Sequence, residues 1–505
     1  MTENPLKVVC AYLQERSSSA AEQEVERLLK TLLPSTPFAG KVKAVGGYVR
    51  DQYLSVLKND PSIQPEDLDV VIDMRGGAEA ITRYLHENIV NPDGTRPISE
   101  PHPMGKGYPI WQIVFKSDVV HGGETYRTAG AEIEFVEPMK ESYPDPTSRQ
   151  RMVEPATIDE DISRRDFTVN MLLKDLTTGE VEDLSGVGKE DLKQGVLRGH
   201  PKVELDKMFS DDPLRMLRLI RFHVKYGWKI PRFVLKAVKR NAERINIISA
   251  ERIMEELEKI MNLGKLNKAI RLMSLTDLLK HVFPEVEQMK GVAQTAKWHG
   301  EGDVYRHTLR VLKNTPPGVE NQIAALLHDV GKPSTSKVVG DEIQTHSHDE
   351  VGAEIAEGIL RRLKFDNATV ERVKSMVKYH MQPHFMSKDE DFSVKGLRRF
   401  IRKVGEGMVD SILALARADE LGAIPDKARI PDLIKRIEEV RKQTPIPKKP
   451  ILNGHEIMQL LSIPPGPEVG RATSTLTEIS DDYAEQGREL TKEDAKRELL
   501  ERFKK

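Results

Sequence analysis

Two aspartates, Asp67 and Asp69, stand one residue apart in an apolar stretch that ends at Ile72. In a β-strand, residues i and i+2 point to the same face, so both carboxylates would lie side by side while Leu68 and Val70 enter the core. Two carboxylates this close repel each other unless a cation neutralises them. Mg²⁺ prefers hard oxygen ligands and also coordinates phosphates, and two such ions can bind the attacking and leaving oxygens of a phosphoryl transfer. The alternative is a pair of solvated aspartates at a strand end.

A double glycine, Gly46-Gly47, follows the apolar run 42–45 and precedes what reads as a helix start containing Arg50. Glycines let a ligand approach the backbone closely, and the free N–H groups of a helix N-terminus bind phosphate. The pattern predicts a phosphate-binding turn. A short glycine motif is equally typical of an ordinary strand–helix turn, so it gains meaning only from its combination with the aspartates.

Gly46-Gly47 followed by Asp67 and Asp69 resembles the signature of the nucleotidyltransferase superfamily that includes DNA polymerase β. The resemblance implies that Asp67 and Asp69 are the catalytic, magnesium-binding carboxylates. A third downstream carboxylate sometimes completes that site. Glu134 is the candidate, and Glu132 lies on the same strand face and could replace it, although a solvated strand residue is the commoner role for each.

The run Arg164-Arg165-Asp166-Phe167-Thr168-Val169-Asn170 makes the resemblance more specific. It is similar to a hallmark of class II CCA tRNA nucleotidyltransferases and bacterial poly(A) polymerases. The resemblance implies that Arg164 and Arg165 contact the triphosphate, that Asp166 contacts the ribose, and that Asn170 belongs to the same nucleotide site. The chemistry agrees, because guanidinium groups match phosphate oxygens bidentately. A surface patch of ion pairs is the alternative.

Asp212 and Arg215 match the Glu/Asp-Asp-x-x-Arg motif with which this family reads the incoming base. We expect a helix to begin here, capped by Ser210 or Asp211. Adenine and cytosine each carry an amino donor beside an unprotonated ring nitrogen, so a carboxylate and a guanidinium fit them. Uracil and guanine present the reverse order and would leave buried groups unpaired, at about 1–3 kcal/mol each. Arg218, one turn further, is expected near a phosphate. A local i,i+3 ion pair between Asp212 and Arg215 is the alternative.

Histidines and aspartates cluster in the third quarter of the chain, where His328-Asp329 lies between an apolar helix and a glycine. This resembles the HD phosphohydrolase superfamily, and several bacterial tRNA nucleotidyltransferases carry such a domain. The resemblance maps its divalent-metal ligands to His307, His328, Asp329 and Asp419; imidazole and carboxylate suit a transition metal or Mg²⁺. His348 and His380 could complete a second metal site or bind phosphate.

Length and composition limit the wider interpretation. A chain of 505 residues is too long to fold around a single hydrophobic core. The net charge is −2, and hydrophobic residues make up 38% of the chain. No apolar run approaches the roughly 18 residues that span a bilayer, the first 15 residues lack a secretory h-region, and Cys10 is the one cysteine. We therefore expect a cytoplasmic protein without membrane contact, whose RNA surface is a local patch. The sequence does not indicate its oligomeric state.

The expected fold is α+β: a small mixed β-sheet nucleotidyltransferase head followed by an all-helical neck, HD domain and tail. Short β-rich runs fall at 42–45, 68–72, 111–115 and 133–136, and nearly everything after Asp211 reads as helix. The predicted division is an N-terminal helix within 1–36, the head at 37–200, the neck at 201–290, the HD domain at 291–425 and an RNA-binding tail at 426–505.

The resemblance implies an enzyme that adds CCA, or C or A alone, to the 3′ end of tRNA from CTP and ATP. A poly(A) polymerase shares the motifs, although 104–110 looks more like the tRNA enzymes. A third possibility is an HD phosphohydrolase whose head only senses nucleotides; the intact Asp67 and Asp69 argue against it. Met139 stands where close relatives often have an arginine, which bears on the choice between C and A.

Overall fold

The computed structural model describes residues 20–65, 67–104, 110–142, 152–294, 302–339, 342–388, 392–423, 429–443 and 451–503. The chain forms two compact units. One comprises Met1–Leu257 and Leu272–Val282, and the other comprises Glu258–Arg271 and Phe283–Lys505. The five-part domain division stays a prediction. Residues 1–19 of the expected N-terminal helix and the segment 105–109 lie outside the described residues.

A seven-stranded mixed sheet forms the head, in the order β11-β10-β1-β2-β7-β4-β3. Strands β2 and β7 run parallel, and the other neighbours are antiparallel. The predicted mixed sheet is therefore confirmed. The strands are β1 Val42–Val45, β2 Asp69–Ile72, β3 His102–Met104, β4 Ile110–Val114, β7 Glu132–Val136, β10 Leu172–Asp175 and β11 Val181–Asp183; the short pairs are β5 Val119–His121 with β6 Glu124–Tyr126, and β8 Met139–Ser142 with β9 Met152–Pro155.

The predicted alternation around the two aspartates is confirmed. Leu68 and Val70 are buried, whereas Asp67 and Asp69 are exposed. Within β2, Asp69 and Val70 face opposite sides of the sheet because they are successive strand residues, whereas Asp67 and Leu68 precede the strand. Helices α2 (Gly47–Lys58) and α3 (Gly77–Asn88) pack on the sheet.

The head has further helical segments, one of which begins with a side-chain capping box. Residues 20–32 are helical, as expected, and Leu33–Ser35 adds a 3-10 turn. Helix α4 (Ile158–Ser163) begins with a capping box between Thr157 and Glu160, which satisfies two backbone donors at once. A 3-10 turn at Thr168–Asn170 and helix α5 (Gly188–Gln194) complete the head.

One expectation in the neck is wrong. Helix α7 (Leu214–Tyr226) begins after Pro213, and the cap is neither Ser210 nor Asp211, because both of these belong to the preceding helix α6 (Leu205–Asp211). The Asp212 carboxylate accepts the Leu214 N–H instead, at 3.2 Å. The other helices here are α8 Arg232–Asn241, the 3-10 turn Ala242–Ile247, α9 Ala250–Asn262, α10 Leu266–Leu275, α11 Leu279–Val282 and α12 Pro284–Glu287.

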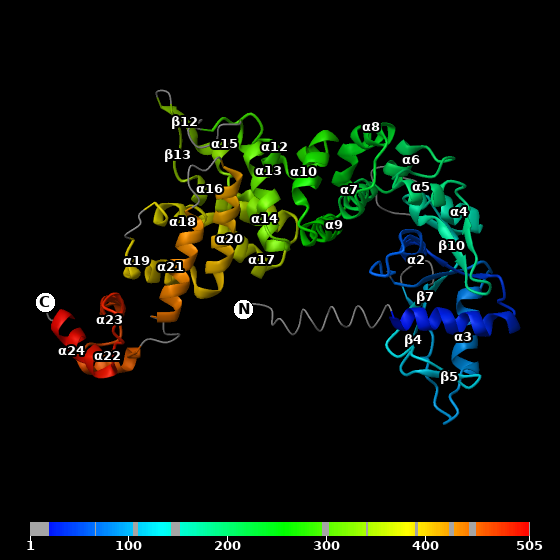
Figure 1. The fold of residues 1–505 in the computed structure, drawn as a ribbon, viewed down its shortest axis with the longest axis horizontal. Coiled ribbons are helices and arrows are strands. Elements are labelled where there is room, and N and C mark those ends of the chain that lie inside the picture. The colour runs from blue at the N-terminus through cyan, green and yellow to red at the C-terminus, as the bar shows by residue number, and fades with distance from the viewer. Residues whose placement is uncertain are drawn as a thin grey trace. The chain divides into compact units, whose positions relative to one another are not determined.

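The histidine-rich region is a helical bundle with one exception to the all-helical expectation. Strands β12 (Ser336–Val339) and β13 (Glu342–Thr345) pair antiparallel, and their β-branched valines, isoleucine and threonine favour extended backbone. The helices are α13 Val304–Asn314, α14 Val319–Leu327, α15 Lys332–Thr335, α16 His348–Arg362, α17 Asn367–Tyr379, α18 Met381–Met386, α19 Val394–Val404 and α20 Glu406–Gly422 (Figure 1).

Four more helices follow α20: α21 Ile430–Gln443, α22 Gly454–Leu461, α23 Pro467–Glu485 and α24 Lys492–Phe503. The last three share a small apolar core that includes Ile457, Leu476 and Leu499. None of the helices in the described part of the chain combines the length and the apolar character needed to cross a membrane.

Candidate nucleotidyltransferase site and histidine–aspartate cluster

The glycine turn, the aspartate strand and the arginine motif meet at one place. Gly46 has φ +73°, and a Cβ added to it would lie 3.7 Å from Asp69 Oδ2 and 3.8 Å from Arg165 Nη1. Asp69 is the register neighbour of Val45 on β1 and of Glu134 on β7. The structure therefore brings together four residues that are far apart in sequence, at the N-terminus of the helix that Gly47 begins.

Both motif arginines are held by Asp161, which sequence reasoning did not single out. Asp161 Oδ1 accepts from Arg164 Nη2 at 2.7 Å, and Oδ2 accepts from Arg165 Nη2 at 3.1 Å. The sequence spacing could have indicated these contacts, because Arg164 and Arg165 follow Asp161 by three and four residues, and residues at that spacing are neighbours on a helix. Arg164 also donates to the Met139 carbonyl oxygen and pairs with Glu141 at 3.1 Å. Its guanidinium thus fastens strand β8 to helix α4.

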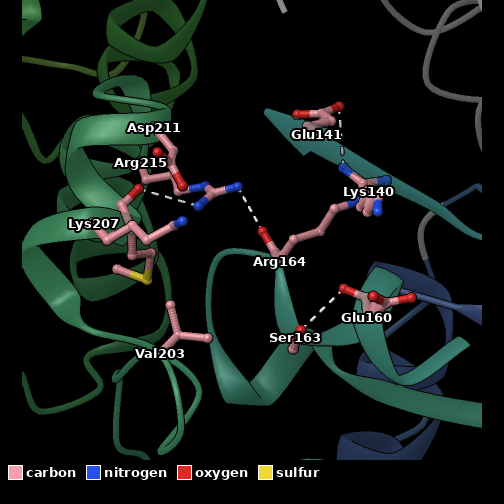
Figure 2. A pocket seen from close by; sticks show the side chains of 10 residues that line it. Lys140, Glu141, Glu160, Ser163, Arg164, Val203, Lys207, Asp211 and Arg215 are labelled. Carbon is pink, nitrogen blue, oxygen red and sulfur yellow. Dashed lines mark hydrogen bonds and ion pairs between the residues drawn. The ribbon is translucent and has the colours of Figure 1, made fainter. Parts of the chain in front are cut away.

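A cleft of about 220 Å³ opens beside these arginines. Figure 2 shows Arg215 reaching into it from α7 and bonding to the main chain at Arg164. The lining is strongly charged, with cations and carboxylates interleaved, so it suits a charged or polar ligand better than an apolar one. The lining residues are Lys140, Glu141, Glu160, Ser163, Arg164, Val203, Lys207, Met208, Asp211 and Arg215.

Four of the predicted nucleotide ligands form hydrogen bonds with one another. Asp166 accepts from Asn170 at 2.9 Å and from Arg218 Nη2 at 2.7 Å, and Asn170 accepts from Arg50 at 2.8 Å. Arg50 is 1% exposed and forms a bidentate pair with Asp51. Burial alone would raise the pKa of Asp166, but the Arg218 charge and the hydrogen bonds lower it to about 2. These residues therefore form a network that holds the arginine motif against α7.

The predicted base-reading pair does not form a local ion pair. Arg215 donates to the main-chain oxygens of Met208 and Arg164, at 3.1 and 2.6 Å, and Asp212 Oδ2 lies 3.3 Å from Arg252 on α9. The same helix carries Glu256, which pairs with Arg221 at 2.6 Å. Helix α9 therefore braces α7, and it positions the Asp212 carboxylate.

Six predicted metal ligands converge in the histidine-rich bundle. His307 Nε2 lies 2.8 Å from Asp419 Oδ1, and His328 Nε2 lies 3.3 Å from Asp329 Oδ2. On the other side of Asp329, Oδ1 lies 3.5 Å from His348 Nε2 and 3.9 Å from His380 Nε2. Two triplets, each able to hold a metal ion, therefore share Asp329: His307-His328-Asp329 and Asp329-His348-His380.

Three of these histidines are oriented in the same way. His328, His348 and His380 each have Nδ1 within 2.6–2.9 Å of the carbonyl oxygen three residues earlier. The Nδ1 proton is therefore on the backbone side, and each Nε2 presents a lone pair to the cluster. Those three buried Nε2 atoms have no hydrogen-bond partner among the described residues. Burial without a partner costs free energy, and a bound cation would remove that cost.

The charges in the cluster shift its pKa values. Burial lowers the pKa of His380 to about 3, assisted by His328 and His348. Burial alone would raise the pKa of Asp329, but His328 and Lys332 hold it well below its usual value. Burial alone would lower the pKa of His328, but Asp329 raises it above its ordinary value, so a metal ion that binds there would displace a proton from His328. The cluster fits a divalent metal.

Three stretches of the chain match known domains. Residues 42–198 match the poly A polymerase head domain, residues 227–290 match the probable RNA and SrmB-binding site of polymerase A, and residues 304–424 match the HD domain. A CC-adding tRNA nucleotidyltransferase from Thermus thermophilus is 34% identical over 68% of this chain and 77% of its own. The chain belongs to the tRNA nucleotidyltransferase and poly(A) polymerase family. An A-adding tRNA nucleotidyltransferase from Deinococcus radiodurans is 31% identical over 64% of this chain and 75% of its own.

The fold of this nucleotidyltransferase is also that of solved relatives. The crystal structure of the Bacillus stearothermophilus CCA-adding enzyme in complex with CTP matches 96% of this chain and 98% of its own, with a TM-score of 0.61 and 20% identity. The Thermotoga maritima CCA-adding enzyme complexed with tRNA matches 92% of this chain and 91% of its own, with a TM-score of 0.56 and 20% identity. The α+β head and the following helices are therefore the family architecture.

Two residues that the sequence did not place in a site join this nucleotidyltransferase's histidine–aspartate cluster. His384 Nε2 lies 2.9 Å from Asp419 Oδ2, and Lys332 Nζ lies 2.6 Å from Asp329 Oδ2. His384 follows His380 by four residues, which is the spacing of neighbours on one helix face. Lys332 follows Asp329 by three.

Proposed function

We propose that this nucleotidyltransferase adds C and A to the 3′ end of tRNA. The 3′ hydroxyl attacks the α-phosphorus of CTP or ATP, a new phosphodiester bond forms, and pyrophosphate leaves. The observation that carries the proposal is the meeting of Gly46, Asp69 and Arg165 beside Glu134 in a chain of this family. Because tRNA is matured in the cell interior, we place this activity in the cytoplasm.

Asp67 and Asp69 are the proposed catalytic carboxylates. Both side chains are exposed, and Asp69 lies beside the glycine turn. Their oxygens suit Mg²⁺. A magnesium ion bound there supplies positive charge to the triphosphate and the attacking oxygen. Glu134 lies beside Asp69 in register and is proposed as the third carboxylate. Gly46 and Gly47 give the phosphates close access to the backbone.

The arginine motif is proposed to hold the rest of the nucleotide. Arg165 lies near Gly46 and Asp69 and therefore faces the phosphates, while Arg164 borders the charged cleft. Asp166 and Asn170 are proposed at the ribose, and Arg50 and Arg218 support them through the buried network. A nucleotide contact by Arg50 requires its pair with Asp51 to open.

Base choice is proposed to rest on Asp212 and Arg215. Asp212 and Arg215 are not paired with each other. Arg252 contacts the Asp212 carboxylate, and main-chain oxygens accept from Arg215, but a carboxylate and a guanidinium each have further hydrogen-bonding capacity that we propose serves the incoming base. Adenine and cytosine present the complementary donor and acceptor, whereas uracil and guanine leave both protein groups facing like partners. Among the relatives, one is named for adding CC and another for adding A, which agrees with a pair that accepts both bases.

The length of the product distinguishes this proposal from the runner-up. A tRNA transcript that ends at the discriminator base, incubated with CTP and ATP together, should gain three nucleotides and stop. A poly(A) polymerase would extend it with a long adenosine tract and would ignore CTP. A head that only senses nucleotides would add nothing.

A second, hydrolytic activity is proposed for the histidine–aspartate cluster, and the two triplets that share Asp329 carry it. We propose that His307, His328, Asp329 and Asp419 hold one divalent metal and that His348 and His380 complete a second subsite with Asp329. Metals bound there supply charge that activates water. The substrates are terminal phosphates or 2′,3′-cyclic phosphates on damaged RNA ends. Water adds to phosphorus, a P–O bond to the ribose breaks, and the ribose oxygen takes the proton.

Hydrolysis of such phosphates would prepare RNA ends for nucleotide addition. An extending enzyme needs a free 3′ hydroxyl as its nucleophile, and a phosphate on that end blocks extension. The test is phosphate release or ring opening from an RNA with a cyclic-phosphate end, in the presence of Mg²⁺, Mn²⁺, Ni²⁺ or Co²⁺ in turn. If no metal supports hydrolysis, the cluster has a structural role and the second activity is rejected.

A further inference from the structure

The histidine–aspartate cluster opens toward one side. The side chains of His328 and His380 are fully buried, whereas Asp419 is 13% exposed and His384 is 20% exposed. The exposed fraction of the side chain therefore increases from Asp329 to Asp419 and from Asp419 to His384. His384 is therefore the most exposed side chain of those that contact the two cluster aspartates.

The short helix α18 forms the edge of that opening. It packs against α20, which carries Asp419, and His384 fixes the contact through its 2.9 Å interaction with Asp419 Oδ2. The next residue, Phe385, is 60% exposed. A single exposed aromatic residue is common on protein surfaces. This one is adjacent to the residue that borders the opening.

A cation accompanies the exposed ring. Lys388 Nζ lies 5.7 Å from the centroid of Phe385, within the range of a cation–π contact. An aromatic surface next to an ammonium group is the combination with which proteins bind single-stranded nucleic acid, because every base has a π-face and every linkage has a negative charge.

We propose that Phe385 is the platform on which the terminal base of an RNA 3′ end stacks while the phosphate of the same nucleotide enters the histidine–aspartate cluster. Lys388 lies where it can neutralise the preceding phosphodiester. The site thereby prefers nucleotide ends over simple phosphate esters, and it accepts any terminal base. This inference rests on the proposed hydrolytic activity and names its substrate class.

Two substrates test the inference with the full-length protein. One is a short RNA that ends in a 2′,3′-cyclic phosphate, and the other is bis(p-nitrophenyl) phosphate, which has no base and no ribose. With Phe385→Ala, we expect KM for the RNA to rise about five- to tenfold, as loss of one stacked base implies, with little change in kcat. Hydrolysis of bis(p-nitrophenyl) phosphate should stay within about twofold of wild type. Phe385→Tyr should restore the RNA KM.

Two controls accompany this test. Phe233→Ala removes a similarly exposed phenylalanine from α8 and should leave both reactions unchanged. Nucleotide addition to a tRNA with a free 3′ hydroxyl, measured for every variant, reports whether the chain is folded.

The outcomes separate the inference from the activity on which it rests. An unchanged KM for the RNA in Phe385→Ala, or an equal loss with both substrates, overturns the stacking platform and leaves the hydrolase intact. If wild-type protein hydrolyses neither substrate with any of the four metals, the hydrolase proposal fails and the platform fails with it.

Discussion

Arg215 Nη2 donates a 2.6 Å hydrogen bond to the main-chain oxygen of Arg164. The backbone of the arginine motif, which is proposed to hold the triphosphate, therefore orients Arg215, which is proposed to read the base. Arg164 is in turn fixed by Asp161 and by Glu141 on strand β8. We therefore expect base recognition and phosphate placement to be coupled: a substitution that moves Arg215 should also affect triphosphate binding, and one that moves Arg164 should also affect base choice.

Replacing either Asp67 or Asp69 with alanine should abolish nucleotide addition, by at least about a thousandfold, because each carboxylate is proposed to bridge a metal to the triphosphate, a contribution of several kcal/mol. Both side chains are exposed, so the thermal unfolding midpoint should stay near that of wild type. Single-turnover addition of radiolabelled ATP to tRNA measures the loss. Near-normal incorporation by either folded variant would remove both aspartates from the catalytic role.

Asp212→Ala should relax base choice more than it slows ATP addition. The substitution removes the group that faces the oxygens of uracil and guanine, and so removes a penalty as well as a contact. The ratio of kcat/KM for ATP to that for UTP and GTP should fall about tenfold or more, for a penalty of about 1–3 kcal/mol.

Arg252→Gln is the matched control for that variant. It releases Asp212 Oδ2 from its 3.3 Å neighbour but leaves the carboxylate itself in place, so selectivity should change by less than in Asp212→Ala. If both variants discriminate among the four nucleotides as wild type does, Asp212 has a purely structural role at the start of α7.

Much of the site could be predicted from local pattern. The exposed and buried alternation at 67–70, the glycine turn and the helix-borne histidines all depend on spacings of one to four residues, which sequence shows directly. The partners of the charged side chains could not be predicted. Asp166 with Arg218 and Asp212 with Arg252 join residues 52 and 40 positions apart, and several other arginines were equally plausible partners. The paired strands β12 and β13 were missed because two four-residue strands within a helical region carry little periodic signal.

Asp166 should make stability depend on pH at the acid end. Its pKa in the folded protein is about 2, below the ordinary 3.8. A carboxyl whose folded pKa is depressed contributes stability above its unfolded pKa and loses it as pH falls through the folded value. The contribution, on the order of 2 kcal/mol, should be full above about pH 4 and disappear near pH 2.

The difference in unfolding midpoint between wild type and Asp166→Asn, followed from pH 6 to pH 2, measures this contribution. Wild type should be the more stable protein at pH 6, and the difference should shrink between pH 4 and pH 2. A difference that does not change with pH would mean that folding does not depress the pKa of Asp166.

Asp329→Ala should eliminate hydrolysis of a cyclic-phosphate RNA end while nucleotide addition to an intact 3′ hydroxyl stays nearly unchanged. The reason is that Asp329 belongs to both proposed metal triplets, so its loss should also lower the bound metal measured by inductively coupled plasma analysis. Loss of addition in a folded Asp329→Ala protein would contradict the separation of the two activities.

The most direct test of the central claim is incubation of wild-type protein with tRNA that lacks CCA, or that ends in CC, and each of the four nucleotides separately. We predict that CTP extends the first tRNA by two residues, that ATP extends the second by one, and that UTP and GTP give little product. The Asp69→Ala protein should give none. Repeated addition of A to either tRNA without use of CTP, or no addition at all, would contradict the account.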